Sequence, residues 1–241
     1  MKSEPLIIET YRRLLAAYGP QGWWPAETVF EMMVGAVLTQ TCSWANVERA
    51  IHALKAADAL SPAAIQTMPE TKLAELIRPS GYYNAKARKL KALASFLITE
   101  FDGDPACMAA VPTAGLREML LAVYGVGEET ADAFLLYAAD RPVFVVDAYT
   151  RRLAARLGLA EEKIDYGEMS ALFADAIPSG TAGKDDAPVM GEYHALIVRH
   201  AKEACRKVPL CDGCVLSEIC PMGSPAIPGT LATKAAKAAP D

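Results

Sequence analysis

Four cysteines near the end of the chain have the spacing of a metal-binding loop. They form the pattern C-x5-C-x2-C-x5-C with Cys205, Cys211, Cys214 and Cys220. Four thiolates in one short segment can hold a structural zinc ion or an iron–sulfur cluster, since both accept four cysteine sulfurs. Spacing alone leaves both metals open, whereas two disulfides would need an oxidising compartment. The segment therefore predicts a metal site with four thiolate ligands.

A glycine turn and an aspartate about twenty residues later form a second candidate site. Gly125-Val126-Gly127 lies between two helical patterns, where glycines permit a tight turn. Backbone N–H groups at the start of the following helix would suit a phosphate oxygen. Asp147 precedes another helical pattern and is predicted to cap a helix over residues 148–157. Taken alone, the turn is more simply explained as an ordinary corner between two helices, and a role of Asp147 as a cap is compatible with a catalytic one.

Helix signals dominate the elements that must position these residues. They predict a first helix over residues 3–19, another from residue 61, and a long helix capped by Asn84 that ends near Gly103. The only strand-like run covers residues 143–146 and has no partner run, so we expect a buried approach to the next helix. The fold class predicted from these signals is all-α.

Composition and charge indicate where the chain acts and what it contacts. The N-terminus has charges among its first dozen residues and no cleavable apolar stretch, and no apolar run could span a bilayer. We therefore expect a cytoplasmic monomer with no membrane partner and reduced cysteines. The net charge of −5 argues mildly against binding to phosphates. Basic residues nevertheless cluster within residues 86–91, 151–156 and 202–207.

Three motifs occur in the order that is typical of one protein family. The cysteine loop resembles that of endonuclease III, although the family usually has six residues between its first two cysteines and this chain has five. Residues 120–132 resemble the family's helix-hairpin-helix motif, and residues 145–152 resemble its catalytic aspartate segment. The chain thus resembles the endonuclease III superfamily of DNA glycosylases over roughly residues 5–221. This resemblance implies two helical domains and a [4Fe–4S] cluster on the four cysteines.

The resemblance also implies roles for two carboxylates. Asp147 would stabilise the positive charge that develops on the sugar when an N-glycosidic bond breaks, and would orient the attacking water. Glu129 stands where bifunctional members carry a lysine that forms a Schiff base with the sugar. Glutamate cannot form that imine, so we expect a monofunctional glycosylase. Alternatively, Glu129 only favours the dipole of its helix.

Features of the N-terminal half resemble one branch of the superfamily, 3-methyladenine DNA glycosylase III. They are Trp24-Pro25, the turn with Gln40 and the following Trp44, and they imply alkylated purines as substrates. By position, Gln40 would fill the gap left by a flipped nucleotide, Tyr82 would wedge into the opposite strand, and the hairpin glycines would contact the backbone. Trp24 and Trp44 would stack on the base, although burial in the core explains either tryptophan alone.

The domain order that we predict is interrupted. Residues 1–22 join residues 137–221 in a domain that carries the cluster, residues 23–136 form a central domain with the hairpin, and residues 222–241 form a disordered tail poor in large apolar groups. Double-stranded DNA with a damaged base would lie between the domains. Two alternatives remain, a bifunctional enzyme for oxidised pyrimidines and a non-catalytic, metal-stabilised DNA-binding module.

Overall fold

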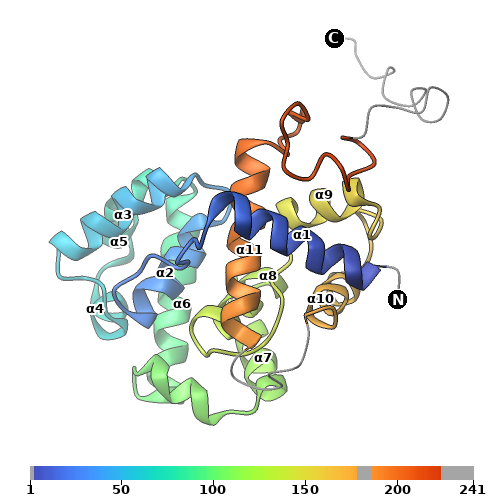
Figure 1. Cartoon of the computed structure of the whole chain (residues 1–241). Coiled ribbons are helices and arrows are strands. Elements are labelled where there is room, and N and C mark those ends of the chain that lie inside the picture. Colours follow the sequence, from blue (N-terminus) through green and yellow to red (C-terminus); the bar gives the residue numbers. More distant parts are fainter. Residues whose placement is uncertain (1–2, 178–185, 224–241) are drawn as a thin grey trace.

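The computed structural model describes residues 3–177 and 186–223, and within these ranges the chain forms helices and no β-strand. The predicted all-α class is confirmed. The predicted tail lies outside the described residues apart from residues 222–223. In chain order (Figure 1) the elements are α1 Ser3–Tyr18, α2 Val29–Thr39, α3 Trp44–Ala56, α4 Pro62–Thr67, α5 Glu70–Leu76, the 3-10 turn η1 Arg78–Ser80, α6 Tyr83–Phe101, η2 Pro105–Ala110, α7 Thr113–Leu121, α8 Glu128–Tyr137, α9 Ala148–Leu157, α10 Tyr166–Ala174 and α11 Asp186–Glu203. No helix in the described part of the chain is long and apolar enough to cross a membrane.

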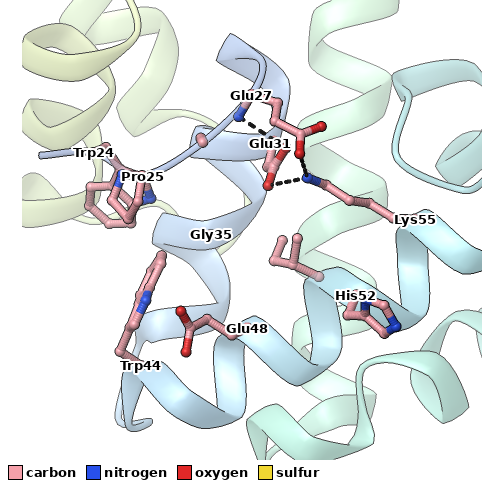
Figure 2. Close-up of a pocket in the computed structure, with 11 residues that line it drawn as sticks. Trp24, Pro25, Glu27, Glu31, Gly35, Trp44, Glu48, His52 and Lys55 are labelled. Atoms are coloured by element: carbon pink, nitrogen blue, oxygen red, sulfur yellow. Dashed lines mark hydrogen bonds and ion pairs between the residues drawn. The ribbon is translucent and has the colours of Figure 1, made fainter.

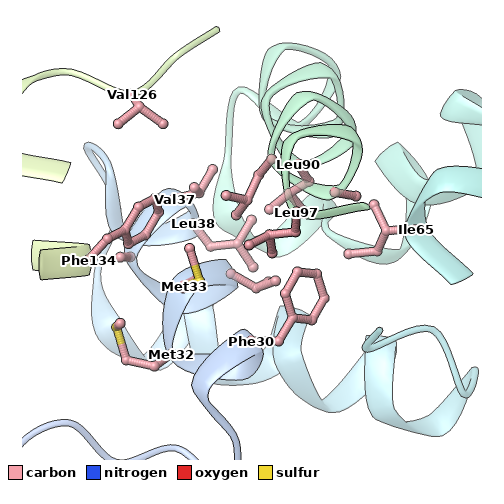
Figure 3. Close-up of a cluster of buried hydrophobic side chains, with 14 of the residues drawn as sticks. Phe30, Met32, Met33, Val37, Leu38, Ile65, Leu90, Leu97, Val126 and Phe134 are labelled. Atoms are coloured by element: carbon pink, nitrogen blue, oxygen red, sulfur yellow. The ribbon is translucent and has the colours of Figure 1, made fainter. Parts of the chain in front are cut away.

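Helix α2 forms the centre of the first hydrophobic core. Apart from Glu31 its residues up to Leu38 are apolar, and every residue from Phe30 to Leu38 is buried. Helices α3, α6 and α8 pack directly against it. Figure 3 shows its side chains meeting Leu90 and Leu97 of α6, Ile65 of α4 and Phe134 of α8. A helix that is apolar on all sides is stable in water only when other elements cover it, as here.

The second hydrophobic core surrounds helix α11. This helix packs against α1, α8 and α9, and it crosses behind α1 in Figure 1. Buried side chains of α1, α9 and α10 and of residues 144–146 complete the core. Ala133 and Leu136 of α8 also belong to it, so α8 contributes to both cores. The domain boundaries near residues 22 and 136 stay a prediction.

The start of α6 differs from the sequence-based prediction. The helix begins at Tyr83, which places Asn84 inside its first turn, so the prediction that Asn84 caps the helix is wrong. The chain reverses through Gly81, with φ 68°, and Tyr82, with φ 45°. The helix has no side-chain cap, and Tyr82 is left 75% exposed at its end.

Candidate active site

Asp147 caps α9 as the sequence predicts. The buried residues Phe144, Val145 and Val146 lead directly into it. Its Oδ1 accepts a hydrogen bond from the backbone N–H of Thr150 at 2.7 Å. The helix covers Ala148–Leu157, the predicted range, and Gly158 at φ 70° ends it. The predicted strand-like run is therefore the approach that fixes the position of this carboxylate.

The second oxygen of Asp147 faces a histidine. Oδ2 lies 3.5 Å from His194 Nε2 of α11, and the aspartate side chain is 13% exposed. Burial acts to raise the pKa of Asp147, but the contact with His194 and the amide of Thr150 outweigh it and lower the pKa below its usual value. Asp147 is therefore a carboxylate held ionised in a mostly buried position.

Glu129 lies in the first turn of α8 and interacts with Asp147. Its pKa is raised, first because neighbouring groups exclude water from the carboxyl and second because the Asp147 carboxylate repels its negative charge. His194 and Arg151 partly offset this effect. The structure therefore brings the two predicted catalytic carboxylates into one electrostatic unit.

A cluster of aromatic rings lies next to this unit. The rings of Trp24 and Trp44 are 5.6 Å apart, and Trp23 is 5.2 Å from Trp24 and 5.7 Å from Trp44. Tyr137 is 5.6 Å from Trp24 and is hydrogen-bonded to His194. A continuous series of side chains thus connects the predicted base pocket to Asp147.

Two hollows flank Trp24. One, of about 420 Å³, lies between α2 and α3, and Figure 2 shows Trp24, Pro25 and Trp44 on one side of it. At its other end Lys55 bridges Glu27 and Glu31 at 2.9 Å each. The second, of about 390 Å³, is lined by Trp23, Trp24, Tyr137 and Gly191 among others. Gly35 lets the indole approach α2 closely, because a Cβ there would meet Trp24 Nε1 at 3.2 Å.

The hairpin formed by α7, residues 122–127 and α8 has the predicted tight turn. Gly125 has φ +85°, and a Cβ there would collide with the Lys89 side chain at 2.3 Å. Gly127 precedes α8. This helix has no side-chain cap, so the first backbone amides of α8 are available to an anion. Arg117 of α7 braces the turn with hydrogen bonds of 2.7 and 3.3 Å to the carboxylate of Asp132.

Gln40 is in contact with this hairpin. Its Nε2 donates to the carbonyl oxygen of Gly125 at 3.1 Å and to the Thr130 hydroxyl at 3.0 Å. Its Oε1 accepts from Lys89 Nζ at 2.6 Å. To enter a gap in DNA, the Gln40 side chain would have to exchange all three contacts for contacts with bases.

The turns that carry Gln40 and Tyr82 are joined by one buried lysine. Lys86 of α6 donates from Nζ to the carbonyl oxygens of Leu38, at 2.8 Å, and Ser80, at 2.7 Å. Each of these carbonyls lies two residues before one of the predicted DNA-contacting side chains. The side chain is 2% exposed, and burial lowers its pKa. Lys86 therefore fixes the spacing of the two turns.

The four cysteines line a common cavity, together with Arg156 and His200. The pKa of the Cys214 thiol is raised, first by burial and then by the charges of the other three cysteines, so the four sulfurs lie near one another. In the ranges that the structure describes, no three metal-binding side chains are grouped tightly enough for a single ion. Four cysteine thiolates are the donor set that a [4Fe–4S] cluster takes.

Three arginines of α9, which the sequence suggested as a basic patch, point to carbonyl groups of the protein. Arg152 donates from Nε to the carbonyl oxygen of Cys205 at 2.9 Å. Arg156 donates to Cys205 Sγ at 3.1 Å and to the carbonyl of Arg206 at 2.7 Å. Arg151 donates to the carbonyl of Ile164 at 2.8 Å. These guanidinium groups hold loops in place.

Sequence reasoning missed three residues of the site, Trp23, Tyr137 and His194. Trp23 adjoins Trp24, and this tryptophan pair was a usable signal. Tyr137 is the last residue of α8, and His194 lies on the buried face of α11. A single tyrosine or histidine on a helix with many apolar residues does not indicate a site until the packing is known.

Comparison with known proteins assigns the chain to a family. The HhH-GPD superfamily of base excision DNA repair proteins matches residues 34–179. A protein of Methanocaldococcus jannaschii, provisionally named a DNA repair glycosylase, is 49% identical over 89% of this chain and 96% of its own length. Endonuclease III of Sulfolobus acidocaldarius is 27% identical over 80% of this chain and 81% of its own.

Solved structures agree with this assignment. Helicobacter pylori 3-methyladenine DNA glycosylase, bound to 1,N6-ethenoadenine, matches with a TM-score of 0.71 and 31% identity over 83% of this chain and 97% of that chain. A trapped endonuclease III–DNA covalent intermediate matches with a TM-score of 0.76 and 22% identity over 91% of this chain and 96% of that chain, which shows a common fold. The chain belongs to the HhH-GPD superfamily of base excision DNA repair proteins and is a DNA glycosylase.

Proposed function

We propose that this glycosylase hydrolyses the N-glycosidic bond of alkylated purines, 3-methyladenine foremost, in double-stranded DNA and leaves the strand intact. The observation that carries the proposal is the pair formed by Asp147 and Glu129, a glutamate where a Schiff-base lysine would be required. The 31% identity to a 3-methyladenine glycosylase supports the substrate class.

The chemistry uses Asp147 as a charge stabiliser. The bond between the sugar C1′ and the base breaks, and its electron pair leaves with the base. A purine alkylated at a ring nitrogen already carries positive charge, so it departs neutral without protonation by the enzyme. The sugar becomes an oxocarbenium-like cation beside the ionised Asp147 carboxylate. Water then adds to C1′, and its proton passes to Asp147 or to solvent.

The aromatic cluster would recognise the base. An electron-poor alkylated purine stacks favourably on indole faces, and Trp24 borders both hollows next to Tyr137. Gln40 and Tyr82 would contact the opened stack, and the amides around Gly127 would contact a backbone phosphate. The rings would thereby select the base, while Asp147 acts on the sugar.

We also propose that Cys205, Cys211, Cys214 and Cys220 hold a [4Fe–4S] cluster in a cytoplasmic, monomeric enzyme. The support is their common cavity and the mutual effect of their charges. When bound, the cluster would supply cross-links that order the loop. The arginines of α9 already hold this loop through its carbonyl groups.

Duplexes with single lesions test the proposal. The enzyme should release free alkylpurine, the strand should break only after alkaline treatment, and borohydride should not trap the protein on DNA. Asp147→Asn should bind the lesion duplex but lose most base release while melting near the wild-type temperature. If Asp147 were only a cap, its loss would cost only about 1 kcal/mol of stability and would leave turnover unchanged. Borohydride trapping, or release of thymine glycol but no alkylpurine, would contradict the proposal.

A further inference from the structure

The His194 imidazole is buried with one ring nitrogen unsatisfied. The residue is 6% exposed, and Nε2 is completely enclosed without a hydrogen bond of ordinary geometry. Asp147 Oδ2 lies 3.5 Å from this nitrogen. A buried ring nitrogen without a partner costs stability, so its orientation toward a carboxylate needs a reason.

The other ring nitrogen is fixed by Tyr137. The Tyr137 hydroxyl lies 2.8 Å from His194 Nδ1 and 3.1 Å from the carbonyl oxygen of Gly191. When the ring is neutral, the Asp147 carboxylate that faces it favours the tautomer with its proton on Nε2, and the Tyr137 hydroxyl then donates to Nδ1. When the ring is protonated, Nδ1–H donates to the hydroxyl, which donates instead to Gly191. In both cases Nε2–H faces Asp147.

We propose that His194 is a positioning residue for base release, which holds the Asp147 carboxylate through Nε2–H while Tyr137 fixes the ring. The inference rests on the proposed function, in which Asp147 stabilises the sugar cation. The Nε2–Oδ2 distance is longer than an ordinary hydrogen bond, as is common in catalytic sites without substrate, and it shortens when the site closes around the nucleotide.

The surroundings explain why Asp147 needs this partner. Burial opposes its negative charge, and Glu129 of α8 adds a second carboxylate nearby. Burial raises the pKa of Tyr137 well above its usual value, and the charges of Asp147 and of Glu192 on α11 add to this effect, so the hydroxyl keeps its proton and stays a donor. His194 is thus the group that offsets the burial of Asp147 from the α11 side, as the amide of Thr150 does from α9.

The pH profile of base release tests the proposal. Single-turnover release of 3-methyladenine from methylated duplex DNA would be measured from acid to neutral pH for wild type, His194→Ala and His194→Gln. Without His194, the hydrogen bond from Thr150 is left to oppose the effect of burial, so the pKa of Asp147 rises and the acid limb moves to higher pH. In His194→Ala the rate on this limb should fall roughly 10- to 100-fold, the range expected for a lost hydrogen bond to a charged group. Gln offers an amide donor and should restore most of the rate.

Tyr137→Phe is the second variant, and it keeps the proposal testable if His194→Ala does not fold. Without the hydroxyl, a neutral ring can place its proton on Nδ1, so the acid limb should move in the same direction but less far. Identical profiles for wild type, His194→Ala and Tyr137→Phe, with Asp147→Asn inactive, would overturn the role of His194 alone. An active Asp147→Asn variant would overturn the proposed function and the inference together.

Discussion

Replacing Lys86 by Met removes the contact that holds the turns of Gln40 and Tyr82 together. Met keeps most of the aliphatic length of the side chain but cannot donate, so the carbonyls of Leu38 and Ser80 lose their buried partner. Each orphaned acceptor costs about 1–3 kcal/mol. Burial of the charged amino group is itself unfavourable, so its removal offsets part of this cost. We therefore expect a loss of about 2–4 kcal/mol in the free energy of unfolding.

Lys91→Met is a matched control on the same helix. Its Nζ also bridges two carbonyls, those of Gln66 at 2.9 Å and Met68 at 2.5 Å, but at a more exposed position away from both turns. Hydrogen bonds near the surface can be replaced by water, so this variant should lose less than about 1 kcal/mol. Urea denaturation would compare the two variants, and titration of a lesion duplex would show weaker binding for Lys86→Met alone.

The ionisation of Lys86 adds a pH dependence. Burial lowers the pKa of Lys86 in the folded protein. At pH values between the pKa of the folded state and that of the unfolded state, the unfolded chain therefore binds more protons than the folded one. The stability of wild type relative to Lys86→Met should therefore rise with pH through this window. The role of Lys86 in joining the two turns would be refuted if the two proteins were equally stable at every pH. It would also be refuted if Lys86→Met and Lys91→Met lost the same free energy of unfolding.

The remaining predictions concern the hairpin, the wedge and the cysteine loop. Gly125→Ala should destabilise the hairpin and weaken duplex binding, because its φ of +85° is unfavourable for alanine and the new Cβ would displace Lys89; unchanged melting and affinity would contradict this. Tyr82→Ala should leave the melting temperature unchanged, since Tyr82 is 75% exposed. It should weaken binding to lesion duplex more than binding to single strands. Equal weakening of both would make Tyr82 a general contact. Cys211→Ala should lose iron and the brown colour of thiolate-to-iron charge transfer, whereas stoichiometric zinc without iron in anaerobically prepared wild type would overturn the cluster.

The sequence was informative where local rules decide the outcome. Asp147, the following helix and its terminal glycine were predictable because a cap and a helix stop depend on nearby residues. The buried approach at residues 143–146 was predictable because a single apolar run without a partner cannot form a sheet. The start of α6 was not predictable, since two consecutive residues with positive φ are rare before a helix. Gly81 and Tyr82 adopt this conformation, and Asn84 does not cap the helix.

Contacts between residues far apart in the chain could not be predicted, for a different reason. His194 meets Asp147 only because α11 packs against α8 and α9. The sequence of α11 does not indicate which neighbour each of its side chains contacts. Lys86 was read as part of a basic run, whereas the structure places its amino group on two buried carbonyls. A lysine at a buried helical position is rare enough that the pattern of charges alone did not suggest it.

This use of basic side chains changes how the proposed DNA contact must work. Lys86, Lys89 and Lys91 bind oxygens of the protein, and the arginines of α9 bind loop carbonyls. Lys86 is buried, and the other groups would have to exchange these oxygens for phosphates, so the basic clusters in the sequence overstate the positive charge that is ready to bind DNA, and the net charge of −5 gives no compensation. Affinity must then depend more on geometry, through the uncapped amides of α8, the exposed ring of Tyr82 and the tryptophans. Such contacts act fully only on a distorted duplex whose nucleotide is already displaced, and this requirement would separate damaged sites from the bulk of undamaged DNA.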